Sequence, residues 1–576
     1  MMIKKLTTSL FLIGILCVSA IAQNSETSRF NAEEDKLKTW YQADKTNDGF
    51  YGISLNKAYD FLKAKKKKSK TVVVAVIDSG VDTAHADLKD VLWKNPGEIP
   101  GNGIDDDNNG YVDDVYGWNF IGGKDGRNVN DDSYEGARVY YKYLPKYEGR
   151  TIDESKLSKE ELFEYKLWKK AKQTVESEAT EAQNTILMIS WLVRGLPKAD
   201  SAIQTALNKT TYTGTELEQY EAEDQKTARA KLIMMAAFEG FSMKSSTNKE
   251  ISDQLNEYYA SQEKKADAAM KEPENYRNEI VKDNYEDIND RYYGNNDVMA
   301  GDPMHGTHVS GIIAAERNNN LGIDGIADNV KIMMIRTIPN GDEHDKDVAL
   351  AIRYAVDNGA KVINMSFGKG FSPEKKWVDD AVKYAESKNV LLVQGAGNDH
   401  DDNDVVDNFP NKNFISGGSA SNYINVGASS DTSIKQTNDE GKEIKNLTAY
   451  FSNYGKKEVD VFAPGYKIYS SLPGSKYGFL SGTSMASPVV AGIAALTLSY
   501  YPELTAQQLK QIIIQSAQKP ATKVFKPGTT ETVNLSDISV SGGLANAYEA
   551  IKLADQLTSK KPKTIVKPKI IKTQKG

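Results

Sequence analysis

The sequence has almost no cysteine, and beyond its first residues it has no long hydrophobic segment. The single cysteine among 576 residues is Cys17, and it lies in a segment that we expect to be removed. Disulfides therefore do not stabilise the mature chain, and a cysteine nucleophile is excluded. No other stretch is long and apolar enough to cross a membrane, so we expect no transmembrane segment in the mature chain.

A strong charge of one sign is also missing. The net charge is -7, with 26 % charged and 39 % hydrophobic residues, which is typical of a soluble globular enzyme. Nothing in this balance suggests a nucleic acid as a partner. The length is sufficient for more than one domain, and we expect a monomer.

Residues 1–22 have the pattern of a secretory signal peptide. Lys4 and Lys5 form a basic start, residues 6–18 are mostly apolar, and Ala20-Ile21-Ala22 matches a cleavage site. We therefore expect an exported protein that stays in a periplasm, sits at the cell surface or leaves the cell.

Two polar segments flank the expected body of the protein. Residues 23–70 are an N-terminal segment or a short pro-region, and the basic run at 63–70 is either a solvated linker or a processing site. Residues 557–576 are rich in lysine, and from 558 onward they contain no acid. We expect this tail to be disordered.

Three short motifs carry the candidate chemistry. Asp78 follows the apolar run 72–77, which predicts a strand buried on both faces. His305 and Ser484 each precede a run of small and apolar residues that predicts a buried helix. A serine at a helix N-terminus is a common cap, but the free N–H groups there also stabilise an oxyanion. Together, a carboxylate, a histidine and a serine are the parts of a nucleophilic relay.

These motifs resemble the signature blocks of the subtilisin-like serine proteases, the subtilases (peptidase S8 family). The blocks occur in the family's order: Asp78-Ser79-Gly80-Val81-Asp82, His305-Gly306-Thr307-His308-Val309-Ser310-Gly311 and Gly482-Thr483-Ser484-Met485-Ala486-Ser487-Pro488. Ala396-Gly397-Asn398 resembles the block that contains the family's oxyanion-hole asparagine. The resemblance covers roughly 70–125 and 295–520.

The resemblance implies a secreted serine endopeptidase that hydrolyses protein or peptide substrates through an acyl-enzyme. Ser484 would be the nucleophile and His305 the general base. Asp78 would orient His305, and Asn398 would hold the oxyanion. Two other functions stay open: a pseudoprotease that keeps the fold as a binding module, and a ligase or cyclase in which an amine intercepts the acyl-enzyme.

The same resemblance assigns the substrate groove. Extended substrate would pair with Ser366-Phe367-Gly368, and this segment and residues 393–398, including Gly395, would wall the P1 pocket. Asp399 and Asp402 near the rim would favour a basic P1 residue.

A loop rich in aspartate and asparagine predicts a structural calcium site. Its oxygen-bearing residues have the spacing of the first nine positions of an EF-hand loop: Asp105, Asp107, Asn109, Tyr111 (through its carbonyl) and Asp113. The twelfth position is Tyr116 rather than a bidentate glutamate, so we expect no true EF-hand. Similar loops bind calcium in subtilases, whereas the alternative is an ordinary acidic turn.

Strands alternate with helices from about residue 301 onward, which predicts an α/β fold with a doubly wound, mostly parallel sheet. We expect the catalytic domain at 71–134 and 297–556. Residues 135–296 are charged, poor in glycine and helical in periodicity, which predicts an inserted α-helical subdomain. The insertion is a structural embellishment, a lid or recognition arm over the cleft, or an internal inhibitory segment, and the sequence leaves all three open.

Overall fold

The computed structural model describes residues 32–559, except 242, 245, 439 and 440. The predicted signal peptide at 1–22 and nearly all of the lysine-rich tail lie outside the described residues. The described chain is built on a seven-stranded sheet in which every neighbouring pair of strands is parallel. The predicted α/β fold with a parallel sheet is therefore confirmed.

The strand order places β1 between β3 and β4. In spatial order the strands are β2 (Gly117–Asn119), β3 (Val330–Arg336), β1 (Val72–Asp78), β4 (Val362–Met365), β5 (Leu391–Gly395), β6 (Tyr423–Ser429) and β9 (Val461–Pro464). Strands that are covered on both faces read as continuous apolar runs, and β1 shows why. Val74 and Val76 belong to the core on one face, whereas Ala75 and Ile77 belong to the core on the other.

Helices cover both faces of the sheet. The core that contains Val74 also takes residues from α4 (Leu55–Ala64), α11 (Met304–Ala314), α14 (Thr483–Tyr500), α15 (Ala506–Gln515) and α16 (Ala547–Ser559). The opposite core takes residues from α12 (Asp345–Asp357) and α13 (Lys375–Ser387). In the described part of the chain, α14 alone is long and apolar enough to span a membrane, and 89 % of it is buried inside the protein.

The region between β2 and α11 is largely helical. Its helices are α5 (Glu135–Tyr147), α6 (Lys159–Leu207), α7 (Gly214–Gln219), α8 (Gln225–Gly240), α9 (Asn248–Asp267) and α10 (Tyr276–Ile280). The longest of these helices is α6, which runs over 49 residues. A capping box of Ser158 and Glu161 begins this helix.

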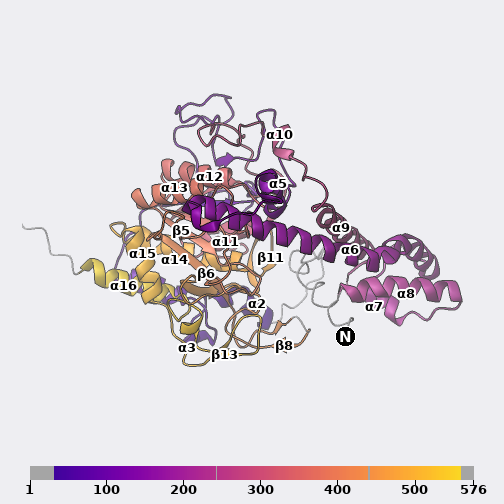
Figure 1. Ribbon diagram of the computed structural model, residues 1–576. Helices are drawn as coiled ribbons and strands as arrows, with labels where there is room; N and C mark the ends of the chain where they lie inside the picture. Colours follow the sequence, from indigo (N-terminus) through magenta and orange to yellow (C-terminus); the bar gives the residue numbers. More distant parts are fainter. Residues whose placement is uncertain (1–31, 242, 245, 439–440, 560–576) are drawn as a thin grey trace, which may run out of the picture.

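The two ends of α6 have different surroundings. Figure 1 shows α6 leaving the body of the protein, with α7 and α8 at its far end. There α6, α8 and α9 share a core of their own, which includes Ile203, Met234 and Phe238. The beginning of α6 packs instead with α5 around Phe371 of the sheet domain.

The N-terminal segment is part of the main core. It contains α2 (Ala32–Thr39), a 3-10 turn (Trp40–Gln42) and α3 (Lys45–Asp48), followed by α4. Trp40 and Tyr41 are fully buried, and the Trp40 indole N–H donates to the Lys467 carbonyl. In the basic run, Lys65 and Lys67 both form ion pairs with Asp555 of α16.

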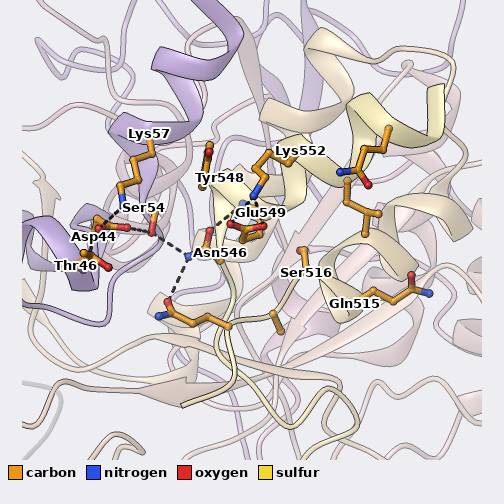
Figure 2. A pocket seen from close by; sticks show the side chains of 14 residues that line it. Asp44, Thr46, Ser54, Lys57, Gln515, Ser516, Asn546, Tyr548, Glu549 and Lys552 are labelled. Atoms are coloured by element: carbon orange, nitrogen blue, oxygen red, sulfur yellow. Dashed lines mark hydrogen bonds and ion pairs between the residues drawn. The ribbon is translucent and has the colours of Figure 1, made fainter. Parts of the chain in front are cut away.

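A polar network also joins the two ends of the described chain (Figure 2). The Asn546 amide donates to the Ser54 hydroxyl at 3.0 Å, and Ser54 donates to Asp44 at 2.8 Å. Lys57 pairs with the same carboxylate at 2.6 Å. These four residues help to line a pocket, and none of the candidate site residues belongs to its lining.

The remaining elements are short. They are the hairpins β7 (Gln436–Thr437) with β8 (Glu443–Ile444), β10 (Ile468–Leu472) with β11 (Lys476–Leu480), and β12 (Val524–Phe525) with β13 (Thr532–Val533), and the 3-10 turns Glu154–Lys156 and Leu535–Asp537.

Candidate active site

Asp78 and His305 meet at the carboxyl end of β1. Asp78 is the last residue of this strand, and His305 is the second residue of α11. His305 Nδ1 lies 2.7 Å from Asp78 Oδ1. The close approach depends on Gly306, because a Cβ there would lie 2.1 Å from the Gly80 carbonyl oxygen.

This contact fixes the tautomer of His305. A carboxylate only accepts hydrogen bonds, so Nδ1 carries the proton and Nε2 keeps its lone pair. Burial alone would lower the pKa of His305, but the charge of Asp78 and its hydrogen bond outweigh burial, and the pKa lies above the usual 6.5. The imidazole side chain is 28 % exposed, whereas the Asp78 carboxylate is 2 % exposed. His305 is thus a base with an accessible face.

Ser484 is the second residue of α14, and its hydroxyl donates to the Ser366 carbonyl at 3.0 Å. Among the described residues, no hydrogen bond joins Ser484 to His305, and Nε2 of His305 has no partner. Catalytic hydrogen bonds are often loose without substrate. The Ser366 hydroxyl in turn donates to the Ser484 carbonyl at 2.8 Å, so the two residues hold each other in place.

Two donors converge beside Ser484. The Asn398 side-chain oxygen accepts from the Thr483 amide at 2.8 Å and from its hydroxyl at 3.0 Å, which leaves the Asn398 Nδ2 group to face elsewhere. A Cβ on Gly482 would lie 3.5 Å from the Ser484 nitrogen and 3.8 Å from Asn398 Nδ2. The absent side chain of Gly482 therefore leaves a space that both donors border, and an oxyanion fits such a space.

The predicted walls of the P1 pocket come together around a residue that the sequence had not singled out. Asn408 Oδ1 would lie 2.7 Å from a Cβ on Gly368, and Asn408 Nδ2 would lie 3.5 Å from one on Gly397. Asn408 also donates to the Ala396 carbonyl at 3.0 Å. No local signal marks Asn408, because only the tertiary fold brings it between the two segments.

The other predicted groove residues have distinct settings. Gly395 packs against the start of α14, where a Cβ would lie 3.0 Å from the Thr483 carbonyl. Phe367 is half-buried, and Asp399 is exposed directly after Asn398. Asp402 accepts the Asp404 amide within its own turn.

The other histidines near the site do not take part in this relay. His308 is fully buried, and its Nε2 lies 3.1 Å from the Ile468 carbonyl oxygen and 3.2 Å from that of Gly478. Burial lowers its pKa to about 3, so this ring is neutral and ties α11 to the β10–β11 hairpin. His344 pairs with Asp132 instead.

The acidic loop groups its carboxylates differently from the predicted set. Oxygens of Asp105 and Asp107 lie within 4.8 Å of one from Glu98, which the sequence analysis had not chosen. Glu98 is 8 % exposed, and its Oε2 is buried with no hydrogen-bond partner. An orphaned buried carboxylate oxygen among other acids fits a hard cation such as Ca²⁺.

The remaining predicted ligands have other partners. The Asp113 carboxylate accepts the amides of residues 101–103. The Asn109 oxygen accepts the Tyr111 amide, and the Tyr111 ring packs edge-on against Trp118 and Tyr354. Asp113 is therefore turned toward the preceding loop rather than toward Asp105 and Asp107.

Comparison with known proteins places this geometry in a family. The chain is 40 % identical over 223 residues to the thermophilic serine proteinase of Bacillus sp. (strain AK1), a match that covers 38 % of this chain and 49 % of that protein. It is 37 % identical over 279 residues to thermitase of Thermoactinomyces vulgaris, covering 47 % of this chain and 85 % of thermitase. The matched region thus spans about half the length of the first of these relatives.

Among solved structures, the prenylagaramide maturation protease PagA matches 44 % of this chain and 82 % of its own, with 27 % identity and a TM-score of 0.34. A family model described as the subtilase family, peptidase S8, matches residues 69–534. That range includes the end of β1, the start of α11 and the start of α14, where the three candidate catalytic side chains lie. The chain therefore belongs to the subtilase family.

Proposed function

We propose that the protein is a serine endopeptidase that hydrolyses peptide bonds through Asp78, His305 and Ser484. The observation that carries the proposal is the 2.7 Å contact between His305 Nδ1 and Asp78, which directs the basic Nε2 away from the carboxylate. The family of the chain supports the same activity.

The proposed reaction starts with a rotation of the Ser484 hydroxyl from the Ser366 carbonyl to His305 Nε2. Ser484 Oγ attacks the scissile carbonyl while its proton passes to Nε2, and Asp78 stabilises the imidazolium. The oxyanion accepts hydrogen bonds from the Ser484 amide and Asn398 Nδ2. The imidazolium then protonates the leaving amine, and water hydrolyses the acyl-enzyme by the same route.

Labelling with a fluorophosphonate probe tests the activated serine. We expect the purified mature protein to be labelled, and the Ser484→Ala variant to remain unlabelled. Ser499→Ala is a matched control, since Ser499 lies at the far end of α14 and its hydroxyl donates to the Leu496 carbonyl. A folded protein that neither reacts with the probe nor cleaves any peptide would be a pseudoprotease. Product masses with an amine present distinguish hydrolysis from ligation.

We also propose that Glu98, Asp105 and Asp107 hold a structural Ca²⁺. Their three carboxylates would otherwise repel one another, and the proximity of Asp107 and Asp106 adds to burial in raising the pKa of Glu98. A bound cation would hold the loop between β1 and β2 and would take no part in the reaction. Backbone oxygens and waters would complete its coordination.

For the export signal, the catalytic domain and the insertion, we propose the boundaries predicted from the sequence. We infer export from the pattern of residues 1–22, and a catalytic domain at 71–134 and 297–556 that is interrupted by residues 135–296. That the protein is a monomer stays a prediction.

A further inference from the structure

The insertion contacts both segments that flank the catalytic end of β1. Since β1 lies between β3 and β4, residues 337–343 after β3 and 366–371 after β4 border the end that carries Asp78. The amides of Thr337 and Ile338 donate to the Asp78 carbonyl, at 3.1 and 3.4 Å. A peptide that extends along Ser366–Gly368 would lie in the space between these two segments.

In the first of these segments, several backbone groups are occupied. The Asn340 amide donates to Asn130 at 2.7 Å, and the Asn340 carbonyl accepts from Asp132 at 3.0 Å. The Arg138 guanidinium of α5 donates to the carbonyls of Asp342 at 2.9 Å and Glu343 at 3.2 Å. An incoming peptide would have to displace these bonds in order to pair with this segment.

Lys369 closes the space between the two segments. Its ammonium lies 2.8 Å from Glu135 at the start of α5 and 3.0 Å from Asp345, and the Lys369 and Glu135 side chains are 1 % and 3 % exposed. The same ammonium donates to the Glu343 carbonyl at 2.6 Å. Removing either partner of a buried ion pair leaves an uncompensated charge. The Lys369 side chain is therefore held firmly in this position.

The open edge after β4 therefore ends at Gly368. The Lys369 amide and carbonyl both pair with Phe409, at 2.9 and 2.8 Å. The next carbonyl, that of Gly370, accepts the Lys170 ammonium of α6 at 2.8 Å. Phe371 then packs into the core shared by α5 and α6. Directly beyond Gly368, the Lys369 amide, the Lys369 carbonyl and the Gly370 carbonyl are already used.

We propose that the insertion restricts recognition on the acyl side of the scissile bond to about three substrate residues. The proposal rests on the proposed peptidase function and on a substrate strand that lies along Ser366–Gly368. The Phe367 carbonyl accepts from Gln394 at 3.3 Å, so Ser366 and Gly368 are the residues left to pair with the substrate. Substrate residues further from the scissile bond meet the Lys369–Phe409 pairing on one side and the bonds of Arg138 on the other. The α5–α6 hairpin is thus a specificity element of this protease.

A series of N-acetylated chromogenic peptides with one to six residues before the scissile bond tests this proposal. We expect kcat/KM of the unmodified enzyme to rise by about tenfold or more between one and three residues, as for the hydrogen bonds of a short paired strand. The fourth to sixth residues should change it by less than about twofold, whatever the side chain at the fourth position. A rise of about tenfold or more on adding the fourth residue would overturn the proposal and leave the peptidase function intact.

Substitution of Arg138 tests whether its guanidinium limits the binding of a fourth substrate residue. In Arg138→Met the Asp342 carbonyl is released, whereas the Glu343 carbonyl keeps its bond from Lys369. A fourth residue should then raise kcat/KM severalfold. Arg150→Met removes a guanidinium of the insertion whose one hydrogen-bond partner among the described residues is the Pro145 carbonyl, and it should behave like the unmodified enzyme. A folded Arg138→Met with no such gain would contradict the role of Arg138. If that variant does not fold, the peptide series on the unmodified enzyme still decides. Failure of every peptide, together with no probe labelling, would contradict the peptidase function itself.

Discussion

His305 Nδ1 lies 2.7 Å from Asp78 Oδ1, although 227 positions separate the two residues. The helical insertion accounts for most of that separation, and the parallel sheet brings the pair together. α11 packs against β1 closely enough for this contact because Gly306 has no side chain. The geometry of the candidate site thus survives a long interruption of the chain.

Asp78→Asn should reduce kcat by about 10⁴-fold with little change in KM. An amide offers an N–H to His305, which favours the tautomer with the proton on the wrong nitrogen. Asp82→Asn is the matched control, since Asp82 accepts amides of residues 84 and 474 away from His305. Steady-state kinetics on a chromogenic peptide measure both variants. An Asp78→Asn variant that is as active as Asp82→Asn would exclude the relay.

The acid limb of the kcat/KM profile should have an apparent pKa above 6.5. His305 must be neutral to act as a base, and Asp78 raises its pKa by stabilising the imidazolium. Activity therefore falls as the pH drops through that raised value, with one proton per site. In Asp78→Asn the residual activity should have its acid limb at lower pH. A limb that does not move would show that another group controls it.

Asn398→Ala should lower kcat by about 10²–10³-fold, the magnitude known for an oxyanion-hole donor in subtilisin, and leave KM nearly unchanged. The substitution removes Nδ2, which borders the space beside Gly482, and only the transition state needs that donor. Asn398→Asp tests the same point with a side chain of equal size, because a carboxylate repels the oxyanion. Activity within about threefold of the unmodified enzyme in both variants would argue against this assignment.

Calcium should raise the unfolding temperature, and chelation should lower it. At a free Ca²⁺ concentration of about 100 times Kd, binding stabilises the native state by about 2.7 kcal/mol. Glu98→Gln should abolish most of the calcium-dependent shift, because it removes a charge from the cluster with Asp105 and Asp107. Asp125→Asn, which changes an exposed carboxylate paired with Arg127, should keep the shift. Equal shifts in both variants would refute the site.

The mature protein should begin upstream of Trp40. Trp40, Tyr41 and Leu55 are fully buried in the main core, so cleavage within the basic run at 63–70 would remove core residues. N-terminal sequencing of the purified protein measures this directly, and a terminus between 63 and 71 on a stable, active enzyme would contradict it. Trp40→Ala should destabilise the fold by about 3–5 kcal/mol in a denaturant titration, whereas Lys63→Ala on the exposed face of α4 should have little effect.

Local patterns were sufficient for much of the fold. The β-branched run at 72–77 indicated β1 because such residues suit a strand covered on both faces. The small and apolar runs after His305 and Ser484 indicated α11 and α14. By contrast, the sequence predicted that residues 135–296 are helical but did not predict the bounds of each helix, such as the 49 residues of α6, because propensity says little about where a long amphipathic helix is interrupted. β2, a strand of three residues, is too short to show a period.

The sequence by itself determined the residue types of the relay, their order, and the sheet that carries them, because these depend on short motifs and on local hydrophobic patterns. Only the tertiary structure decided which distant groups share a space. It brought Asn408 between Gly368 and Gly397, turned Glu98 toward Asp105 and Asp107, and set Lys369 against Glu135. Each of these contacts joins segments that no regular sequence spacing connects. They therefore depend on how the folded chain packs and not on a local pattern.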